Sequence, residues 1–169
     1  MFVIFRLNKK IKLEISYKSR NESLKSTALS LAKGKKLKIE DVYKAVIMIR
    51  RNKLPDPSLI PNAGSFFKNL IVTKKVLTRI LKKIPDIKYY KVSYGHGKVG
   101  YKIPAGWMLD SIGWKNKWVG NCGTWKNQAL IVVTNGKATS NEMLRFITLM
   151  QHDFYENFGF YLEPEVVLV

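Results

Sequence analysis

The segment NAGSFFKN, residues 62–69, carries the side chains in this sequence best suited to delivering a proton. Gly64 allows a tight turn and a close approach of the backbone, and two phenylalanines directly after Ser65 can anchor the following strand. Lys68 and Asn69 then add a cation and an amide. The segment therefore predicts a rigidly held Ser65 hydroxyl beside anion-binding groups. The same pattern is also typical of an ordinary turn serine.

A second candidate is LEPEV, residues 162–166, in which Pro164 separates Glu163 from Glu165. Proline restricts the backbone, and alternation along an extended segment points both carboxylates to the same face. One of the two acids is therefore a candidate functional group. Two solvated acids on an edge strand, where proline is tolerated, remain the alternative.

Several common kinds of site are not indicated. The sequence has no phosphate-binding loop or His-Glu-x-x-His motif. His96 and His152 have no ligand or catalytic partner nearby in sequence, and Cys122, as the only cysteine, provides neither a disulfide nor metal-ligand spacing. Metal sites and hydrolytic triads are therefore not expected.

Charge and hydropathy bound the function further. The 169 residues hold 30 Lys plus Arg against 12 Asp plus Glu, a formal charge of +18 that attracts polyanions. The lysines are spread along the chain, however, and no nucleic-acid recognition signature is present, so nucleic acid is not the expected partner. The apolar runs are far shorter than the roughly 20 residues of a membrane span. At the amino terminus the positive charges follow the apolar residues, whereas in a secretory signal they precede them. We therefore expect a cytoplasmic protein.

The elements that must position these side chains alternate without a parallel strand-helix-strand rhythm, which favours the α+β class. Amphipathic helices and alternating strands are recognised from their apolar periods, and helix ends from capping residues such as Thr73, Ser140 and Gly34. We expect strands at 2–7, 10–15, 66–72, 129–134 and 161–169, a strand pair around the turn at 95–100, and helices at 24–33, 40–51, 74–84, from Pro104 to Gly113, and 141–157.

Four segments, in this order and at these separations, resemble one known family. They are KLPDPSLIPNAGSFFKN (53–69), PAGWMLDSIGWK (104–115), GNCGTWKNQALIVV (120–133) and LEPEV (162–166). Together they are similar to the carboxy-terminal half of the UDP-N-acetylenolpyruvoylglucosamine reductases, the MurB family of peptidoglycan synthesis. The resemblance runs from about residue 2 to residue 169.

The resemblance implies a fold and a domain organisation. It implies a carboxy-terminal substrate domain with a small mixed sheet and packed helices. Residues 1–15 would be the tail end of a preceding FAD-binding region, and 16–169 the substrate-binding domain, with 16–38 as a lid-like insertion.

The resemblance also implies roles for six side chains. Ser65 matches the family's serine proton donor, and Glu165 matches its catalytic glutamate. The positions that match substrate-binding residues, for the diphosphate, the enolpyruvyl end and the substrate lid, are Lys53, Asn69, Gln128 and Tyr17. Leu70, where the family usually has proline, and Trp125, where a histidine is common, depart from the family pattern.

The implied reaction is reduction of UDP-N-acetylglucosamine enolpyruvate to UDP-N-acetylmuramate with FAD and NADPH. It adds a hydride to one carbon of an enol ether and a proton to the neighbouring carbon, and a fixed hydroxyl suits the second step. The family's FAD-binding region has no counterpart in the 169 residues. We therefore expect the chain alone to bind no FAD and to be inactive, and a separate chain carrying that region is the expected partner.

Two other interpretations stay open. The chain is compatible with a non-catalytic, basic anion-binding remnant, either a nucleotide-sugar binder or a nucleic-acid binder that uses the +18 charge. It is also compatible with a degraded gene product that folds poorly, since an unpaired strand edge would be exposed.

Overall fold

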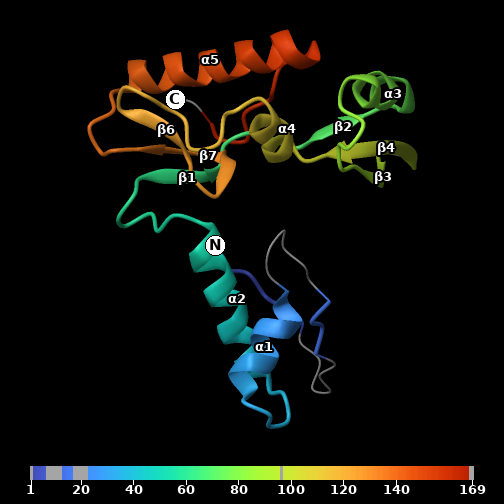
Figure 1. The fold of residues 1–169 in the computed structure, drawn as a ribbon, viewed down its shortest axis with the longest axis vertical. Coiled ribbons are helices and arrows are strands. Elements are labelled where there is room, and N and C mark those ends of the chain that lie inside the picture. The colour runs from blue at the N-terminus through green and yellow to red at the C-terminus, as the bar shows by residue number, and fades with distance from the viewer. Residues whose placement is uncertain (1, 7–12, 17–22, 96, 168–169) are drawn as a thin grey trace. The chain divides into compact units, whose positions relative to one another are not determined.

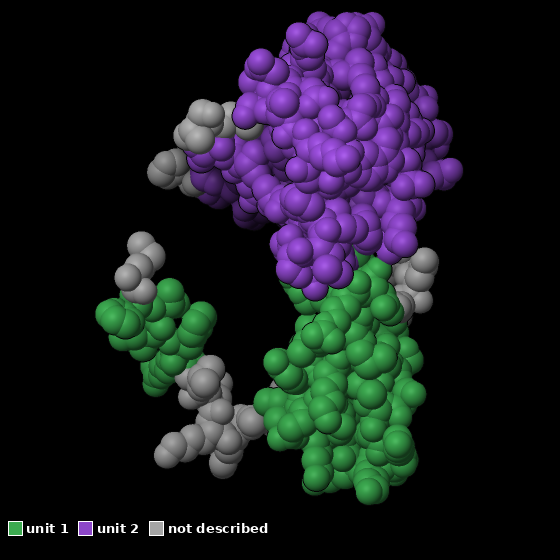
Figure 2. All heavy atoms as spheres, turned by 90° about the vertical axis from the view of Figure 1, so that its left-hand side faces the viewer, with its two compact units in different colours: residues 1–53 green, residues 54–169 purple. Residues whose placement is uncertain are grey.

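The computed structural model describes residues 2–6, 13–16, 23–95 and 97–167. The chain divides into two compact units, residues 1–53 and residues 54–169, coloured separately in Figure 2. Tyr17 and His96 lie outside the described residues. Each unit has its own apolar cluster and is described by itself below.

In its described residues, the first unit contains two helices, α1 (Leu24–Ala32) and α2 (Ile39–Lys53), close to the predicted ranges. Fully buried alanines, Ala28 and Ala45, lie at their contact and let the two backbones approach closely. The helix α1 ends where Lys33 and Gly34 both adopt positive φ, 49° and 77°, which is the left-handed conformation typical of a helix end.

The strands predicted at 2–7 and 10–15 are absent from the parts that the structure describes. Residues 2–6 and 13–16 have no strand assignment, and the apolar side chains of residues 2–5 are exposed. The apolar pattern favours a strand, but a strand also needs a neighbouring strand that accepts and donates its backbone hydrogen bonds. The prediction is therefore wrong for these residues.

The described part of the second unit holds two sheets, both antiparallel throughout. The larger sheet has the order β1-β7-β6-β5, with β1 (Asn62–Ser65), β7 (Gln128–Thr134), β6 (Cys122–Trp125) and β5 (Trp118–Val119). The smaller sheet has the order β2-β4-β3, with β2 (Leu70–Val72), β4 (Lys98–Ile103) and β3 (Tyr90–Tyr94). The α+β class is confirmed, with two antiparallel sheets where one small mixed sheet was expected.

Three helices complete this unit: α3 (Lys74–Lys83), α4 (Ala105–Ser111) and α5 (Ser140–Phe158). In Figure 1 the helix α5 runs along the larger sheet, α3 lies beside the smaller sheet, and α4 lies between them against β7. A single core takes side chains from all three helices and from β2, β4, β6 and β7, and its fully buried large side chains include Phe67, Trp114, Met150 and Phe154. The site elements are thus fixed to one packed body.

The amino terminus of α5 is capped by Thr139, and not by Ser140 as predicted. The Thr139 hydroxyl accepts a hydrogen bond from the Glu142 backbone N–H at 3.2 Å, and the Glu142 carboxylate accepts one from the Thr139 N–H at 2.8 Å. This reciprocal pair satisfies two backbone donors. Ser140 could not form such a pair, because the residue three positions after it is not an acid.

The Thr139 backbone N–H, the Thr139 hydroxyl and the Asn121 amide lower the pKa of the Glu142 carboxyl from its ordinary value of 4.5. Because the pKa is lowered on folding, the ionised carboxylate stabilises the fold above about pH 4.5, and this contribution is lost as the pH falls through the lower folded value. We expect Glu142→Gln to reduce the loss of thermal stability between neutral and acidic pH. Calorimetric Tm values against pH measure it, with Asp86→Asn, an exposed acid on another segment, as the control. Parallel curves for the Glu142→Gln and wild-type proteins would contradict this expectation.

No helix in the described parts of the chain combines the length and apolar content needed to cross a membrane.

Candidate functional site

Ser65 is the last residue of β1 and follows a turn that its neighbours build. The Asn62 side chain accepts a hydrogen bond from the Gly64 N–H at 3.0 Å and donates one to the Ile60 carbonyl at 2.8 Å. Gly64 has φ of 73°, a conformation that side chains with a Cβ rarely adopt. The glycine turn expected from the sequence is therefore present.

The pairing of β1 with β7 contains an irregularity directly before the serine. Asn62 lies opposite Val133, and Ser65 lies opposite Ile131, so β1 has one residue more than β7 over this stretch. An extra residue of this kind bends a strand and re-aims the side chains that follow it. Ser65 emerges from the bulge exposed, immediately before two buried phenylalanines.

Phe66 and Phe67 anchor the backbone beside Ser65. Their exposed fractions are 5% and 0%, and their rings meet edge to face with centroids 5.1 Å apart. The Phe66 N–H donates to the Leu130 carbonyl at 2.9 Å, while the Phe66 carbonyl accepts from the Glu165 N–H at 2.8 Å. The chain therefore changes its hydrogen-bond partner at Phe66, from β7 to the segment that carries Glu165.

The segment 162–166 docks antiparallel on residues 66–68 through a short pairing. Pro164 forms a bridge with Phe67, and the Lys68 N–H donates to the Glu163 carbonyl at 2.8 Å. Within the described residues of these two ranges, the strands predicted at 66–72 and 161–169 are reduced to β2 and to this bridge, respectively. Proline has no N–H with which to extend a ladder.

Exposure alternates along the docked segment. Leu162 is buried, Pro164 and Val166 are half-buried, and Glu163 and Glu165 are exposed. The two carboxylates therefore share the solvent side, and Glu165 is paired through its backbone with the residue next to Ser65.

Lys68 does not act as a cation reserved for Ser65. Its ammonium forms an ion pair with the Glu163 carboxylate, and the two side chains are 50% and 71% exposed. The sequence suggested a positive charge beside the serine, but the pairing of 66–68 with 163–165 brings an acid from the far end of the chain onto that charge.

Asn69 lies at the amino terminus of α4. Its side-chain oxygen accepts a hydrogen bond from the Ala105 N–H at 3.0 Å, which satisfies one of the helix's first backbone donors. The carboxamide is thereby oriented, and its Nδ2 group is the part that suits a phosphate oxygen.

Gln128, the first residue of β7, reaches the same helix. A Cβ built on Gly106 would lie 2.5 Å from the Gln128 Oε1 atom and 3.2 Å from the Leu130 Cβ atom. The Gln128 carboxamide therefore packs directly against the first turn of α4, where only glycine leaves room for it. Asn69 and Gln128 thus meet consecutive residues of one helix, Ala105 and Gly106.

This packing predicts that Gly106→Ala displaces the Gln128 carboxamide. If that group binds substrate, losing its hydrogen bond costs about 0.5–1.5 kcal/mol of binding free energy, and Gly106→Ala should resemble Gln128→Ala. Titration calorimetry with UDP-N-acetylglucosamine enolpyruvate, the substrate that the resemblance implies, measures the loss. The control is Ser111→Ala on the same helix, because the Ser111 hydroxyl bonds only within the helix, to the Met108 carbonyl. Weakened binding in Gln128→Ala together with wild-type binding in Gly106→Ala would contradict this contact.

Two predicted substrate-binding residues are not among the described residues of the second unit. Lys53 is the last residue of α2 in the first unit, where it is half-buried. Tyr17 lies outside the described residues. In the second unit, the structure groups Ser65 with the Glu165 backbone, and Asn69 with Gln128, on elements joined by Phe66–Lys68 and β7.

Sequence reasoning missed two participants in this arrangement. One is Glu163 as the acid that binds Lys68, and the other is Gly106 as the glycine that admits Gln128. A signal for Gly106 exists, because a glycine in the first turn of a helix after Pro104 costs helix stability and calls for a packing reason.

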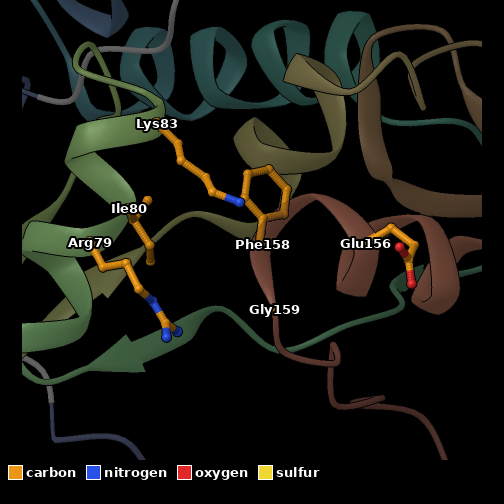
Figure 3. A pocket seen from close by; sticks show the side chains of 6 residues that line it. All are labelled: Arg79, Ile80, Lys83, Glu156, Phe158 and Gly159. Carbon is orange, nitrogen blue, oxygen red and sulfur yellow. The ribbon is translucent and has the colours of Figure 1, made fainter.

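Figure 3 shows a cavity between α3 and the carboxyl end of α5. Its volume is about 180 Å³, and its lining residues are Arg79, Ile80, Lys83, Glu156, Phe158 and Gly159. The Lys83 ammonium donates to the Asn157 carbonyl at 3.2 Å, which places a cation at the negative end of the α5 dipole. The cavity is smaller than the roughly 300–1,000 Å³ of small-molecule sites, and its Lys83 ammonium stabilises a helix end.

Within the residues that the structure describes, no three His, Cys, Asp or Glu side chains gather as a metal site would require. His152 is exposed on α5, with its Nε2 atom 3.9 Å from the Glu156 carboxylate one turn later. Burial, and secondarily the Glu142 charge, raise the pKa of the Cys122 thiol, which disfavours the reactive thiolate.

Residues 56–169 match a family model described as UDP-N-acetylenolpyruvoylglucosamine reductase, C-terminal domain. Relatives with the name UDP-N-acetylenolpyruvoylglucosamine reductase include one from Flavobacterium johnsoniae, 44% identical over 131 residues, which are 78% of this chain and 38% of the relative. The relative from Burkholderia vietnamiensis is 41% identical over 127 residues, 75% of this chain and 35% of the relative. That from Burkholderia multivorans is 36% identical over 165 residues, 98% and 45%. The chain thus spans less than half the length of these relatives.

Proposed function

Because the chain belongs to the UDP-N-acetylenolpyruvoylglucosamine reductase family, we propose that it is the part of such a reductase that binds the enolpyruvyl nucleotide sugar and protonates it. One observation carries the proposal. The Glu165 backbone is hydrogen-bonded to Phe66, so the proposed catalytic glutamate is fixed beside the proposed proton donor, Ser65. These two residues come from opposite ends of the unit and would have no reason to be adjacent in an unrelated fold.

The proposed reaction converts UDP-N-acetylglucosamine enolpyruvate to UDP-N-acetylmuramate. A hydride adds to one carbon of the enol ether, negative charge spreads onto the substrate carboxylate, and the neighbouring carbon then takes a proton. Ser65 supplies that proton from its hydroxyl, and the oxygen regains a proton from solvent. Serine is a weak acid, so proton transfer from Ser65 depends on the fixed position that the bulge and the two phenylalanines provide.

The remaining assignments follow from donor chemistry. The Lys53 ammonium and the Asn69 Nδ2 group supply a charge-assisted and a neutral hydrogen bond to the diphosphate. The Gln128 carboxamide, packed on α4, supplies contacts to the enolpyruvyl end, and Glu165 acts at the reacting end of the substrate. Tyr17 is proposed as part of a substrate lid.

Among the described residues of the second unit, those that line the cavity of about 180 Å³ beside α5 leave too little room for a flavin. We therefore assign no flavin contact to them. In the whole reductase, reduced FAD regenerated by NADPH is the proposed hydride source. The flavin-binding region would be contributed either by sequence outside the matched segment, since the relatives are more than twice as long as that segment, or by a separate chain. The cytoplasm, where nucleotide sugars are made, is the proposed location.

Titration calorimetry tests the binding part of this function and separates it from the polyanion alternative. We expect saturable binding of UDP-N-acetylglucosamine enolpyruvate to the chain, weakened by Asn69→Ala and unchanged by Asn141→Ala, an exposed asparagine on α5. A single-stranded oligonucleotide, measured at about 50 and about 200 mM salt, provides the comparison. Binding of the oligonucleotide alone, with affinity falling by roughly 10³–10⁵ over that range, would instead identify a nucleic-acid binder.

A further inference from the structure

Glu163 and Lys68 are joined twice. The Lys68 backbone N–H donates to the Glu163 carbonyl at 2.8 Å, and the Lys68 ammonium forms an ion pair with the Glu163 carboxylate. Both side chains remain largely exposed, 50% and 71%. An exposed ion pair adds little to folding stability, so this pair calls for a reason other than holding the segment in place.

The backbone fixes which acid faces Lys68. Around the bridge between Phe67 and Pro164, Lys68 lies opposite Glu163 and Phe66 lies opposite Glu165. A slip by one residue would require Pro164 to donate a hydrogen bond, and it has no N–H. A slip by two residues would withdraw the fully buried Leu162 from the core.

Glu165 is the diagonal neighbour of Lys68 in this pairing. Diagonal neighbours in an antiparallel pair are about 7–8 Å apart, which long side chains can span. Glu163 and Glu165 are on the same exposed side of the segment. Two carboxylates therefore compete for one lysine, and in the structure Glu163 holds it.

We propose that Glu163 is a positioning residue: by binding Lys68 it keeps this ammonium off Glu165 and leaves the Glu165 carboxyl group available to the substrate. This inference rests on the proposed function, because it concerns the availability of the proposed catalytic glutamate. If Lys68 were instead a catalytic residue, removing its ammonium would abolish activity, which is the opposite of what this proposal predicts.

The competition is tested first without catalysis, in the purified chain. The probe is the carboxyl ¹³C resonance of Glu165, compared in four proteins: wild type, Lys68→Met, Glu163→Gln, and the double variant. We expect Lys68→Met to leave the Glu165 resonance in place when Glu163 is present, and to shift it when Glu163 is glutamine. Equal responses in both backgrounds would overturn the inference, whether or not any reductase activity is found.

The second test uses the reductase assembled with its flavin-binding region. We expect Glu163→Gln to lower kcat by about two- to fivefold with unchanged KM, the range that an exposed ion pair can supply, because Lys68 then engages Glu165. Adding Lys68→Met should restore the wild-type kcat. Loss of activity in Lys68→Met alone, or a double variant as impaired as Glu163→Gln, would overturn the inference.

Hydrogen exchange of the Glu165 backbone amide separates positioning from a merely structural role. This amide donates to the Phe66 carbonyl, so its exchange reports whether the segment stays docked. We expect unchanged protection in Glu163→Gln, with Glu156→Gln on α5 as the matched control. Faster exchange in both Glu163→Gln and the double variant would mean that the pair only holds the segment, and would contradict the proposal.

Discussion

Replacing Ser65 by alanine is expected to lower kcat of the assembled reductase by roughly 10²–10⁴-fold, the usual contribution of a positioned proton donor. The hydroxyl is the only group removed, because the turn is held by Asn62 and Gly64, and the backbone after it by Phe66 and Phe67. Substrate affinity should therefore change little. The loss should fall on the protonation step and leave binding intact.

Single-turnover kinetics and calorimetry on the same variant measure the two quantities. Ser93→Ala provides the matched control, since Ser93 is an exposed serine in β3 of the smaller sheet. Unchanged kcat in Ser65→Ala would remove Ser65 from the mechanism. A large loss of affinity with normal kcat would make it a binding residue instead.

Phe67→Ala is expected to have the largest effect on stability. The side chain is fully inaccessible, meets the Phe66 ring edge to face, and forms the bridge partner of Pro164. Removing a buried phenylalanine costs about 3–5 kcal/mol, partly through the cavity that remains. Since whole domains are stable by about 5–15 kcal/mol, the unit of residues 54–169 should become marginal.

Urea denaturation followed by tryptophan fluorescence measures this free energy of unfolding. Tyr90→Ala is the control, because Tyr90 is 58% exposed on the smaller sheet and should cost far less. A loss below about 1 kcal/mol for Phe67→Ala would show that the Phe67 side chain is not in the core, contrary to the structure.

Sequence patterns within a few residues predicted the helices and their caps, because their hydrogen bonds join residues close in sequence. The helix predicted at 141–157 became α5, Ser140–Phe158, and Thr73 caps α3 by accepting from the Val76 N–H at 3.4 Å, as expected. The wrong cap at Ser140 was avoidable. Thr139, not Ser140, has a glutamate three residues later, and that spacing identifies the capping residue.

Pairing between distant segments was not readable from the sequence. Residues 66–69 looked like the start of a strand, but their hydrogen bonds go first to Leu130 and then to Glu163 and Glu165. The residues around 66–69 do not indicate that the segment 162–166 will pair with their backbone N–H and carbonyl groups. The same reason explains why residues 2–6 were wrongly expected to form a strand, since no neighbouring strand is available to them in the described structure.

In the candidate site, too, some features follow from nearby residues and others from contacts between distant segments. The turn before Ser65 follows from Asn62 and Gly64, which act within a few residues of each other. The convergence of Asn69 and Gln128 on α4 depends on how the helix packs on β7, and the diversion of Lys68 to Glu163 depends on the docked segment. Residue type suggested candidates, whereas tertiary contacts decided what each one touches.

The central claim is tested most directly by substrate-dependent NADPH oxidation. The chain is co-expressed with the flavin-binding region of a relative, such as the reductase from Flavobacterium johnsoniae, and the purified assembly is assayed with and without UDP-N-acetylglucosamine enolpyruvate. We predict oxidation that requires the substrate and both polypeptides, and that Ser65→Ala slows by roughly 10²–10⁴-fold. An assembly that holds FAD and binds the substrate, yet oxidises NADPH at the same rate with wild-type and Ser65→Ala chains, would contradict the claim.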